Sequence, residues 1–124
     1  MTFVVVTTAV KSKAKAEKLA AMVVGKRLAA CVQYIPVTSI YRWKGRVETA
    51  KEQLLMAKST ALKAGVLVSF IRDNHSYELP EITVMPITGG LGEYLSWIDE
   101  ETTAQAKKRR PAGRFKELPM ARNG

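Results

Sequence analysis

The stretch ACVQYIPVTSIYRWKGRVETAKEQLLMAKS, residues 30–59, decides the fold. Its first half, up to Trp43, is rich in β-branched and aromatic side chains and shows no helical period, so it predicts a strand. Lys44-Gly45 is a turn signal, and residues 46–59 return as the partner strand. The stretch therefore predicts a long β-hairpin.

The length of this hairpin has a structural consequence. Each strand exceeds the ~5 or 6 residues usual in globular proteins, so the end around Trp43 should project beyond a compact domain and need cover. Pro36 has no N–H group to give to a sheet ladder, so the first strand should kink, bulge or run along a sheet edge at that point. The apolar half of the returning strand is residues 53–57.

Five further elements flank the hairpin, and hydrophobic spacing indicates the type of each. They are a buried strand at 3–7, a helix at 13–28, a helix at 60–74, a strand at 81–87 and a short amphipathic helix at 92–101. Ser12 stands where the first helix needs an N-cap. In the second helix we expect one buried side, formed by Leu62, Val66, Leu67, Phe70 and Ile71.

The order of these elements predicts an α+β fold. A β-α-β-β-α-β order is the ferredoxin-like arrangement, a four-stranded antiparallel sheet with two helices on one face. The short helix at 92–101 follows it. One face of the sheet then lacks cover within the chain, and apolar surface of that kind favours assembly with further copies.

Charge divides the 124-residue chain into two parts. Residues 104–124 carry seven basic residues and one acidic residue, so they account for six of the nine net positive charges. With Pro and Gly among the charges and little to bury, this tail is predicted to be disordered. We therefore expect one folded domain, residues 1–103, followed by a basic tail, residues 104–124.

Composition also limits the partners and the compartment. The returning strand of the hairpin lacks the aromatic residues with which RNA-recognition modules of this fold stack bases, so only the tail is expected to touch nucleic acid, and weakly. Cys31 is the only cysteine and cannot form an internal disulfide, which favours a reducing, cytoplasmic setting. The apolar run of the N-terminus, residues 3–6, is too short for a signal peptide or a membrane span.

Three blocks together carry a family resemblance. RLAACVQYIPVTSIYRWKGRVETAKEQLLMAKS at 27–59, HSYELPEI at 75–82 and YLSWI at 94–98 resemble the CutA family, the divalent-cation tolerance proteins. The matching blocks cover roughly residues 4–102 in the family's order. The resemblance implies a non-enzymatic, ferredoxin-like protomer in a tight homotrimer, similar in architecture to the PII signalling proteins, with long strands crossing between subunits.

The resemblance also implies where a metal ion would bind. Family members with a copper-binding pattern supply a Cys before a Thr-Ala pair at the end of the first strand, and two consecutive His residues. Here Thr7 stands at the first position and Asn74-His75 at the pair, so one ligand of three remains. Because copper prefers thiolate and imidazole ligands, His75 would need help from carboxylates or from symmetry copies to bind copper or another divalent cation.

His75, the only histidine, also has interpretations that need no metal. It can end the second helix by meeting the last carbonyls, or line a cleft between subunits with Tyr77 and Glu78. We take Tyr41, Trp43, Tyr77, Glu78 and Glu81 as candidates for such a cleft or for the interface.

No catalytic residues are predicted. Cys31 is expected to be structural, because free cysteine is usually buried and no sign of an activating contact with His75 is visible. The sequence therefore favours a metal-tolerance trimer that acts by binding. The alternative is a PII-like regulator, or a small enzyme, with a small molecule in the inter-subunit clefts.

Overall fold

The computed structural model describes residues 2–103, and the predicted tail at 104–124 lies outside the described residues. The elements follow in the predicted order: β1 (Phe3–Val10), α1 (Lys13–Gly25), β2 (Cys31–Trp43), β3 (Arg46–Thr60), α2 (Ala61–Asp73), β4 (Ile82–Ile87) and α3 (Gly92–Glu101). Predicted and observed bounds differ most in β1, which continues to Val10, and in α1, which ends at Gly25. The predicted N-cap is confirmed, since Ser12 Oγ accepts a hydrogen bond from the Lys15 N–H at 3.2 Å.

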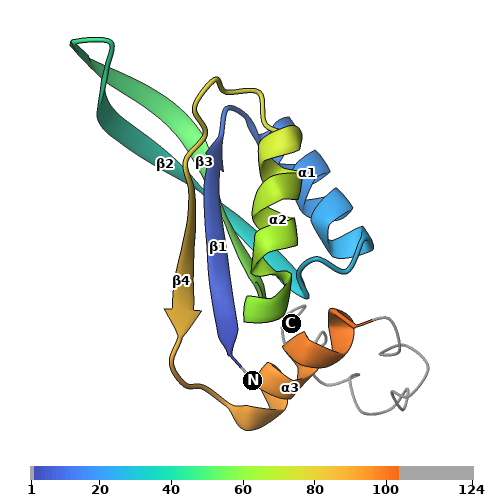
Figure 1. The fold of residues 1–124 in the computed structure, drawn as a ribbon. Coiled ribbons are helices and arrows are strands. Elements are labelled where there is room, and N and C mark those ends of the chain that lie inside the picture. Colours follow the sequence, from blue (N-terminus) through green and yellow to red (C-terminus); the bar gives the residue numbers. More distant parts are fainter. Residues whose placement is uncertain (1, 104–124) are drawn as a thin grey trace.

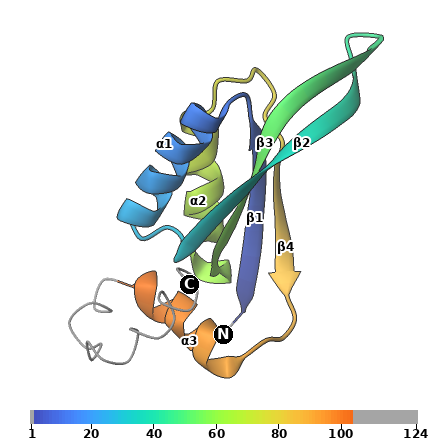
Figure 2. The ribbon, with the colours of Figure 1, turned by 180° about the vertical axis from the view of Figure 1, so that it is seen from behind.

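The strands form one antiparallel sheet in the order β2-β3-β1-β4. Helices α1 and α2 lie together over one face of this sheet, and α3 lies near the end where β1 begins (Figures 1 and 2). The predicted ferredoxin-like arrangement of a single chain is therefore confirmed. Pro36 lies in the edge strand β2, as its missing N–H group requires.

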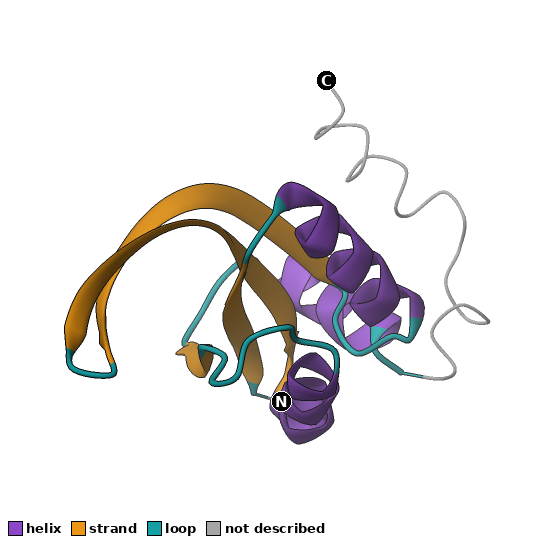
Figure 3. Ribbon diagram, turned by 90° about the horizontal axis from the view of Figure 1, so that it is seen from above, coloured by secondary structure: helices purple, strands orange, loops and turns teal. Residues whose placement is uncertain are grey.

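The hairpin turns through Lys44 and Gly45, both with positive φ, at 50° and 80°. Two successive residues of this kind make the two-residue turn that matches the twist of the strands it joins. β2 and β3 pair from Cys31–Lys58 to Trp43–Arg46, but β1 pairs with β3 only as far as Gln53. The outer part of the hairpin thus has no third strand beside it, and it curves away from the domain (Figures 1 and 3).

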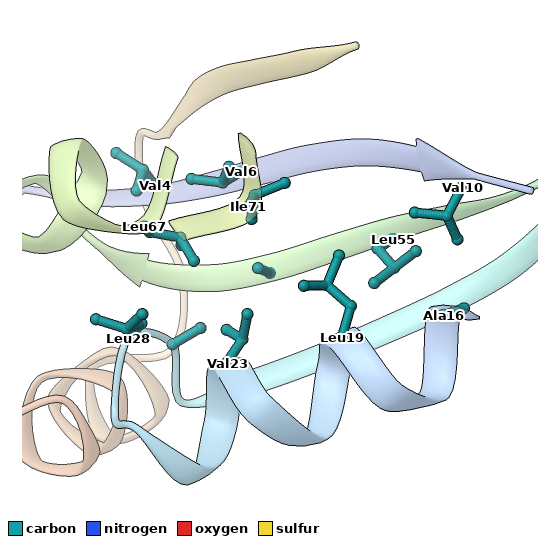
Figure 4. Close-up of a cluster of buried hydrophobic side chains, with 12 residues drawn as sticks. Val4, Val6, Val10, Ala16, Leu19, Val23, Leu28, Leu55, Leu67 and Ile71 are labelled. Carbon is teal, nitrogen blue, oxygen red and sulfur yellow. The ribbon is translucent and has the colours of Figure 1, made fainter. Parts of the chain in front are cut away.

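The core lies between the sheet and the two long helices (Figure 4). The core residues of β1 lie at alternate positions, and those of the helices recur at intervals of three and four. Both sets of side chains therefore face the same layer between the sheet and the helices. The labelled members are Val4, Val6, Val10, Ala16, Leu19, Val23, Leu28, Leu55, Leu67 and Ile71.

The expectation that all five apolar residues of α2 form one buried side is wrong in part. Leu67 and Ile71 are buried, and Phe70 is half-buried, but Leu62 and Val66 are 77% and 58% exposed. Successive helix residues are rotated by about 100°, so Val66 points well away from the side on which Leu67 meets the sheet. The apolar residues of α2 cover a wider arc than the sheet can bury.

The sheet face opposite the two long helices is apolar. Alternation along the strands turns Val5, Ile35, Leu54 and Met56 toward this face, because their neighbours in the strands lie in or pack against the helix-side core. Met85 pairs with Val5 and therefore shares its face. Ile35 and Met85 are each 47% exposed. Helix α3 reaches this face at one end, where Lys58 Nζ lies 5.8 Å from the centroid of the Tyr94 ring. Within residues 2–103 the rest of the face has no covering element, as the sequence predicts.

Candidate functional site

The segment that follows α2 is fixed by hydrogen bonds at its start. Asn74 is the C-cap residue, and its Nδ2 donates to the Phe70 carbonyl at 2.9 Å. The backbone N–H of His75 donates to the Arg72 carbonyl at 3.3 Å. These bonds satisfy carbonyls at the end of the helix. They also hold the backbone at the point where the His75 side chain leaves it.

The His75 ring uses both of its nitrogens. Nε2 lies 2.8 Å from the Ala9 carbonyl oxygen in β1, and Nδ1 lies 3.1 Å from the Tyr77 backbone N. Because a carbonyl needs a donor and an N–H needs an acceptor, the ring is the neutral tautomer with its proton on Nε2. A metal ion at either nitrogen would have to replace one of these hydrogen bonds.

One interpretation of His75 expects it to end the helix and meet the last carbonyls. Only the backbone of His75 does so, and the ring instead reaches across to β1. Sequence spacing pointed to the end of α2, which is the nearest partner along the chain. The chain turns after Asn74, however, and brings the ring to the end of β1, an inner strand of the sheet.

Tyr77 continues the group. Its ring lies 4.8 Å from the His75 ring, centroid to centroid, and its hydroxyl donates to Glu52 Oε2 at 2.8 Å. Burial, followed by the hydrogen bond and the negative charge of Glu52, raises the pKa of Tyr77 above its usual value, and Tyr41 adds a smaller electrostatic contribution. The Tyr77 hydroxyl is therefore protonated at neutral pH and acts as a donor.

Glu52 is the residue that the sequence analysis missed. It lies in β3, directly before Gln53, on the side of the hairpin turn. Gln53 is the residue nearest the turn that still pairs with β1. Glu52 is only 8% exposed. Glutamate is almost never fully buried without a partner, so this carboxylate needs compensation. The feature of the sequence that could have pointed to Glu52 is its position directly before the apolar half of β3, residues 53–57.

The outer part of the hairpin approaches the same segment. Lys44 Nζ lies 5.5 Å from the Trp43 ring centroid and 3.9 Å from Glu78 Oε1. Tyr41 is near enough to Tyr77 to affect its ionisation. The structure thus gathers His75, Tyr77 and Glu78 with the hairpin candidates Tyr41 and Trp43.

Glu81 does not join this group. It is exposed just before β4, and among the described residues no hydrogen bond or ion pair links it to His75 or Tyr77. Thr7 is also engaged elsewhere, because its hydroxyl forms a hydrogen bond with the hydroxyl of Thr83 in β4.

The described part of the chain holds no cluster of metal ligands. Between residues 2 and 103, no three side chains of the His, Cys, Asp and Glu types are placed to hold a metal ion. Cys31 is buried as predicted and pairs with Lys58 near the start of β1, whereas His75 bonds to Ala9 near its end. The two side chains therefore form no dyad.

Two hollows lie beside these residues. The larger, of about 340 Å³, is at the root of the hairpin, and Glu52, Lys11 and Lys51 are among its lining residues. The smaller, of about 130 Å³, lies next to His75 and Asn74 and is flanked by side chains of α1. Hollows lined by charged and hydrogen-bonding side chains are suited to binding a ligand.

A comparison with protein families matches residues 4–101 to the CutA1 divalent ion tolerance protein family. The chain belongs to this family. CutA proteins are described by tolerance of divalent ions and not by a catalysed reaction. The resemblance seen in the three sequence blocks is thereby confirmed.

CutA relatives match most of the chain. It is 37% identical to the chloroplastic protein CutA of Arabidopsis thaliana over 100 residues, which are 80% of this chain and 55% of that protein. The divalent-cation tolerance protein CutA of Yersinia pestis is 39% identical over 97 residues, 77% of this chain and 82% of that protein. The chain thus spans about half the length of the plant relative.

A solved CutA structure has the same fold. The periplasmic divalent cation tolerance protein CutA from Archaeoglobus fulgidus superposes with a TM-score of 0.80 at 34% identity, covering 82% of this chain and 99% of that one. The Arabidopsis relative is described as chloroplastic and the Archaeoglobus protein as periplasmic, so the cytoplasmic setting expected from Cys31 stays a prediction. None of the helices described in residues 2–103 is long and apolar enough to cross a membrane.

Proposed function

We propose that this CutA protein acts as a non-catalytic homotrimer in tolerance of divalent cations. The observation that carries the proposal is the apolar sheet face opposite α1 and α2, on which Ile35 and Met85 are exposed. The hairpin adds further apolar side chains, with Ile40 71% exposed and Val47 also exposed. Contiguous apolar surface of this kind marks a protein interface.

A closed ring suits this surface better than an open array. The sheet face and the projecting hairpin are different surfaces of one chain, so a contact between them is heterologous and must close by rotation to avoid a filament. In a trimer, each hairpin would lie against the sheet face of a neighbouring copy and cover the exposed side chains of both.

Assembly also bears on metal binding. One described chain lacks a three-ligand group, so a divalent cation would be held where copies meet. His75 would supply one imidazole nitrogen at the cost of a hydrogen bond, and the exposed carboxylates of Glu78 and Glu81 are oxygen donors. Imidazole suits copper and zinc, and carboxylates suit harder cations, so weak binding of several divalent ions is expected.

The cytoplasm is the setting we propose, on the support of one observation. Cys31 is free and buried, and a chain with a single unpaired cysteine suits a reducing compartment.

The larger hollow favours a second candidate function. A ligand-responsive regulator of the PII kind would bind a small molecule in clefts between subunits, and the hollow of about 340 Å³ lies at the root of the hairpin, beside the Tyr77–Glu52 pair. This volume falls at the lower end of the range for small-molecule sites.

Two measurements test the first candidate. Light scattering after size exclusion should give a mass three times the 13.7 kDa of one chain, and a monomeric mass would remove the proposal. Calorimetric titration of copper, zinc and magnesium chlorides into metal-free protein should show weak binding that decreases in His75→Ala and Glu78→Gln. Absence of heat for all three ions would leave no support for a direct role of metal binding.

A further inference from the structure

The smaller hollow, of about 130 Å³, lies where two elements meet at one end of the domain. α1 begins and α2 ends at this end, beside the last residues of β1 (Figure 1). One wall of the hollow is the chain after α2, residues 74–76, and Val10 of β1 also contributes. The other wall consists of α1 residues spaced by three and four, which share one side of the helix: Lys15, Lys18, Leu19 and Met22.

Hydrogen bonds hold the two walls in place. His75 Nε2 donates to the Ala9 carbonyl at 2.8 Å, directly before Val10, and Asn74 Nδ2 donates to the Phe70 carbonyl at 2.9 Å. Both nitrogens of the His75 ring are used by the chain, so this residue positions the wall and has no donor left for a ligand. The hollow is therefore a fixed feature of one folded chain.

The lining divides into an apolar buried part and a polar exposed part. Val10 and Leu19 are buried, whereas the two lysines, Asn74 and Ser76 are exposed. In residues 2–103 neither ammonium group and no Ser76 hydroxyl takes part in a hydrogen bond or an ion pair. The Asn74 amide nitrogen has a second hydrogen beyond the one given to Phe70. The exposed rim thus presents several donors, and none of its side chains is a carboxylate.

The positive charge of the rim is not neutralised from within α1. The first turn of this helix has no acidic residue, and a helix N-terminus already carries a partial positive charge, so lysines there are unfavourable. Glu17 lies about 200° around the helix from Lys15, on the opposite side. Its carboxylate is occupied there, because it accepts the Tyr34 hydroxyl at 2.6 Å. Residues that oppose their own element locally are expected where they serve a function.

We infer that this hollow binds a phosphate group, with Lys15 and Lys18 matching its two negative charges and Asn74 and Ser76 donating hydrogen bonds. A volume of about 130 Å³ equals roughly four water molecules, which suits a phosphate group and excludes a nucleoside. The ligand is therefore inorganic phosphate or a small monoester whose remainder extends into solvent. The site goes beyond the proposed function, because its groups belong to one chain and lie on the helix side, away from the open sheet face.

A titration of the isotope-labelled full chain followed by NMR tests the inference. Sodium phosphate is added at about pH 8, where phosphate and its monoesters are dianions, and sodium chloride keeps the ionic strength constant. Saturable shifts should concentrate in the backbone amides of residues 15–19 and 74–76. Glycerol 3-phosphate is the second probe. Tighter binding of the ester identifies a phosphorylated compound as the ligand, and tighter or equal binding of phosphate identifies the free ion.

Substitutions on α1 assign the binding to the hollow. Replacing both Lys15 and Lys18 with Met should weaken binding of phosphate at least about tenfold, because two charge-assisted hydrogen bonds are lost. Replacing both with Arg keeps the charges and should change the affinity less than about threefold. Lys26→Met is the control, because it removes the same charge next to the same helix but outside the hollow, and its effect should be less than about twofold.

Thermal unfolding without phosphate separates binding from folding. The double Met variant should be at least as stable as the unsubstituted protein, because the lysines oppose the helix dipole. The inference is overturned by shifts that do not saturate or that spread over all basic surfaces, by full binding in the double Met variant, or by an equal loss in Lys26→Met. If the double Met variant unfolds, loss of binding in the Arg variant overturns it as well. Light scattering on the same samples keeps the trimer separate, since a monomer that binds phosphate overturns only the trimer.

Discussion

The hydroxyl of Tyr77 donates a hydrogen bond of 2.8 Å to Glu52, which lies 25 residues earlier in the chain. This bond ties the segment after α2 to the root of the hairpin. His75 extends the connection to β1, because its ring contacts Tyr77 and its Nε2 bonds to the Ala9 carbonyl. Three parts of the fold that are distant in sequence are therefore held together by polar side chains.

Tyr77→Phe should destabilise the protein. The substitution keeps the ring and removes the one hydroxyl bonded to the buried Glu52 carboxylate, so we expect a loss of about 1–3 kcal/mol in the free energy of unfolding. Urea denaturation monitored by circular dichroism measures it.

Tyr34→Phe is the matched control for that experiment. Tyr34 also donates to a carboxylate, Glu17 Oε2 at 2.6 Å, but this pair is on the surface, where water replaces a lost hydrogen bond. The loss should be much smaller than at Tyr77. Equal losses at the two sites would show that the burial of Glu52 has no energetic role.

Stability should also fall in alkaline solution because of Tyr77. Its pKa is raised in the folded state, so the folded protein holds this proton more tightly than the unfolded chain does. The resulting contribution is fully present below the unfolded pKa of about 10 and is lost as the pH rises through the folded value. Unfolding free energies measured from about pH 9 to pH 11 should therefore decrease more steeply for the unsubstituted protein than for Tyr77→Phe. Parallel curves would contradict this assignment.

The elements of the fold were predictable from local patterns, and the polar group was not. Period-two and helical spacing gave seven elements in order, and Lys44-Gly45 gave the turn, because these signals involve neighbouring residues. The side of α2 that meets the sheet was predicted less well, since Leu62 and Val66 are as apolar as the buried Leu67. Packing against one face of the sheet decides between them.

The candidate site illustrates the same limit over a greater distance. The sequence drew attention to His75, Tyr77 and Glu78, and the structure gathers them with the hairpin. The partners of the first two are Ala9, 66 residues away from His75, and Glu52, 25 residues away from Tyr77. Contacts of this kind depend on the register of the whole sheet, which local spacing does not specify.

His75→Ala should lower stability even in the absence of metal. It removes the hydrogen bonds at the Ala9 carbonyl and at the Tyr77 N–H, and we expect a loss of about 1–3 kcal/mol for the pair. Thermal unfolding of metal-free protein measures this loss. Ser76→Ala changes the exposed neighbouring residue and should have little effect. If the His75→Ala protein is as stable as the unsubstituted one, the hydrogen bonds of the His75 ring do not stabilise the fold.

A charge on the open sheet face should disrupt the proposed trimer. Ile35 lies on this face and is 47% exposed in the single chain, so Ile35→Asp leaves the protomer's core untouched while placing an unpaired carboxylate in the interface. Sedimentation velocity should show a shift from trimer toward monomer. Leu62→Asp is the control, because Leu62 is more exposed but lies on α2, on the helix side of the sheet, and this variant should remain trimeric. If Leu62→Asp dissociates the protein and Ile35→Asp does not, the copies meet through their helices, and the open sheet face has some other partner.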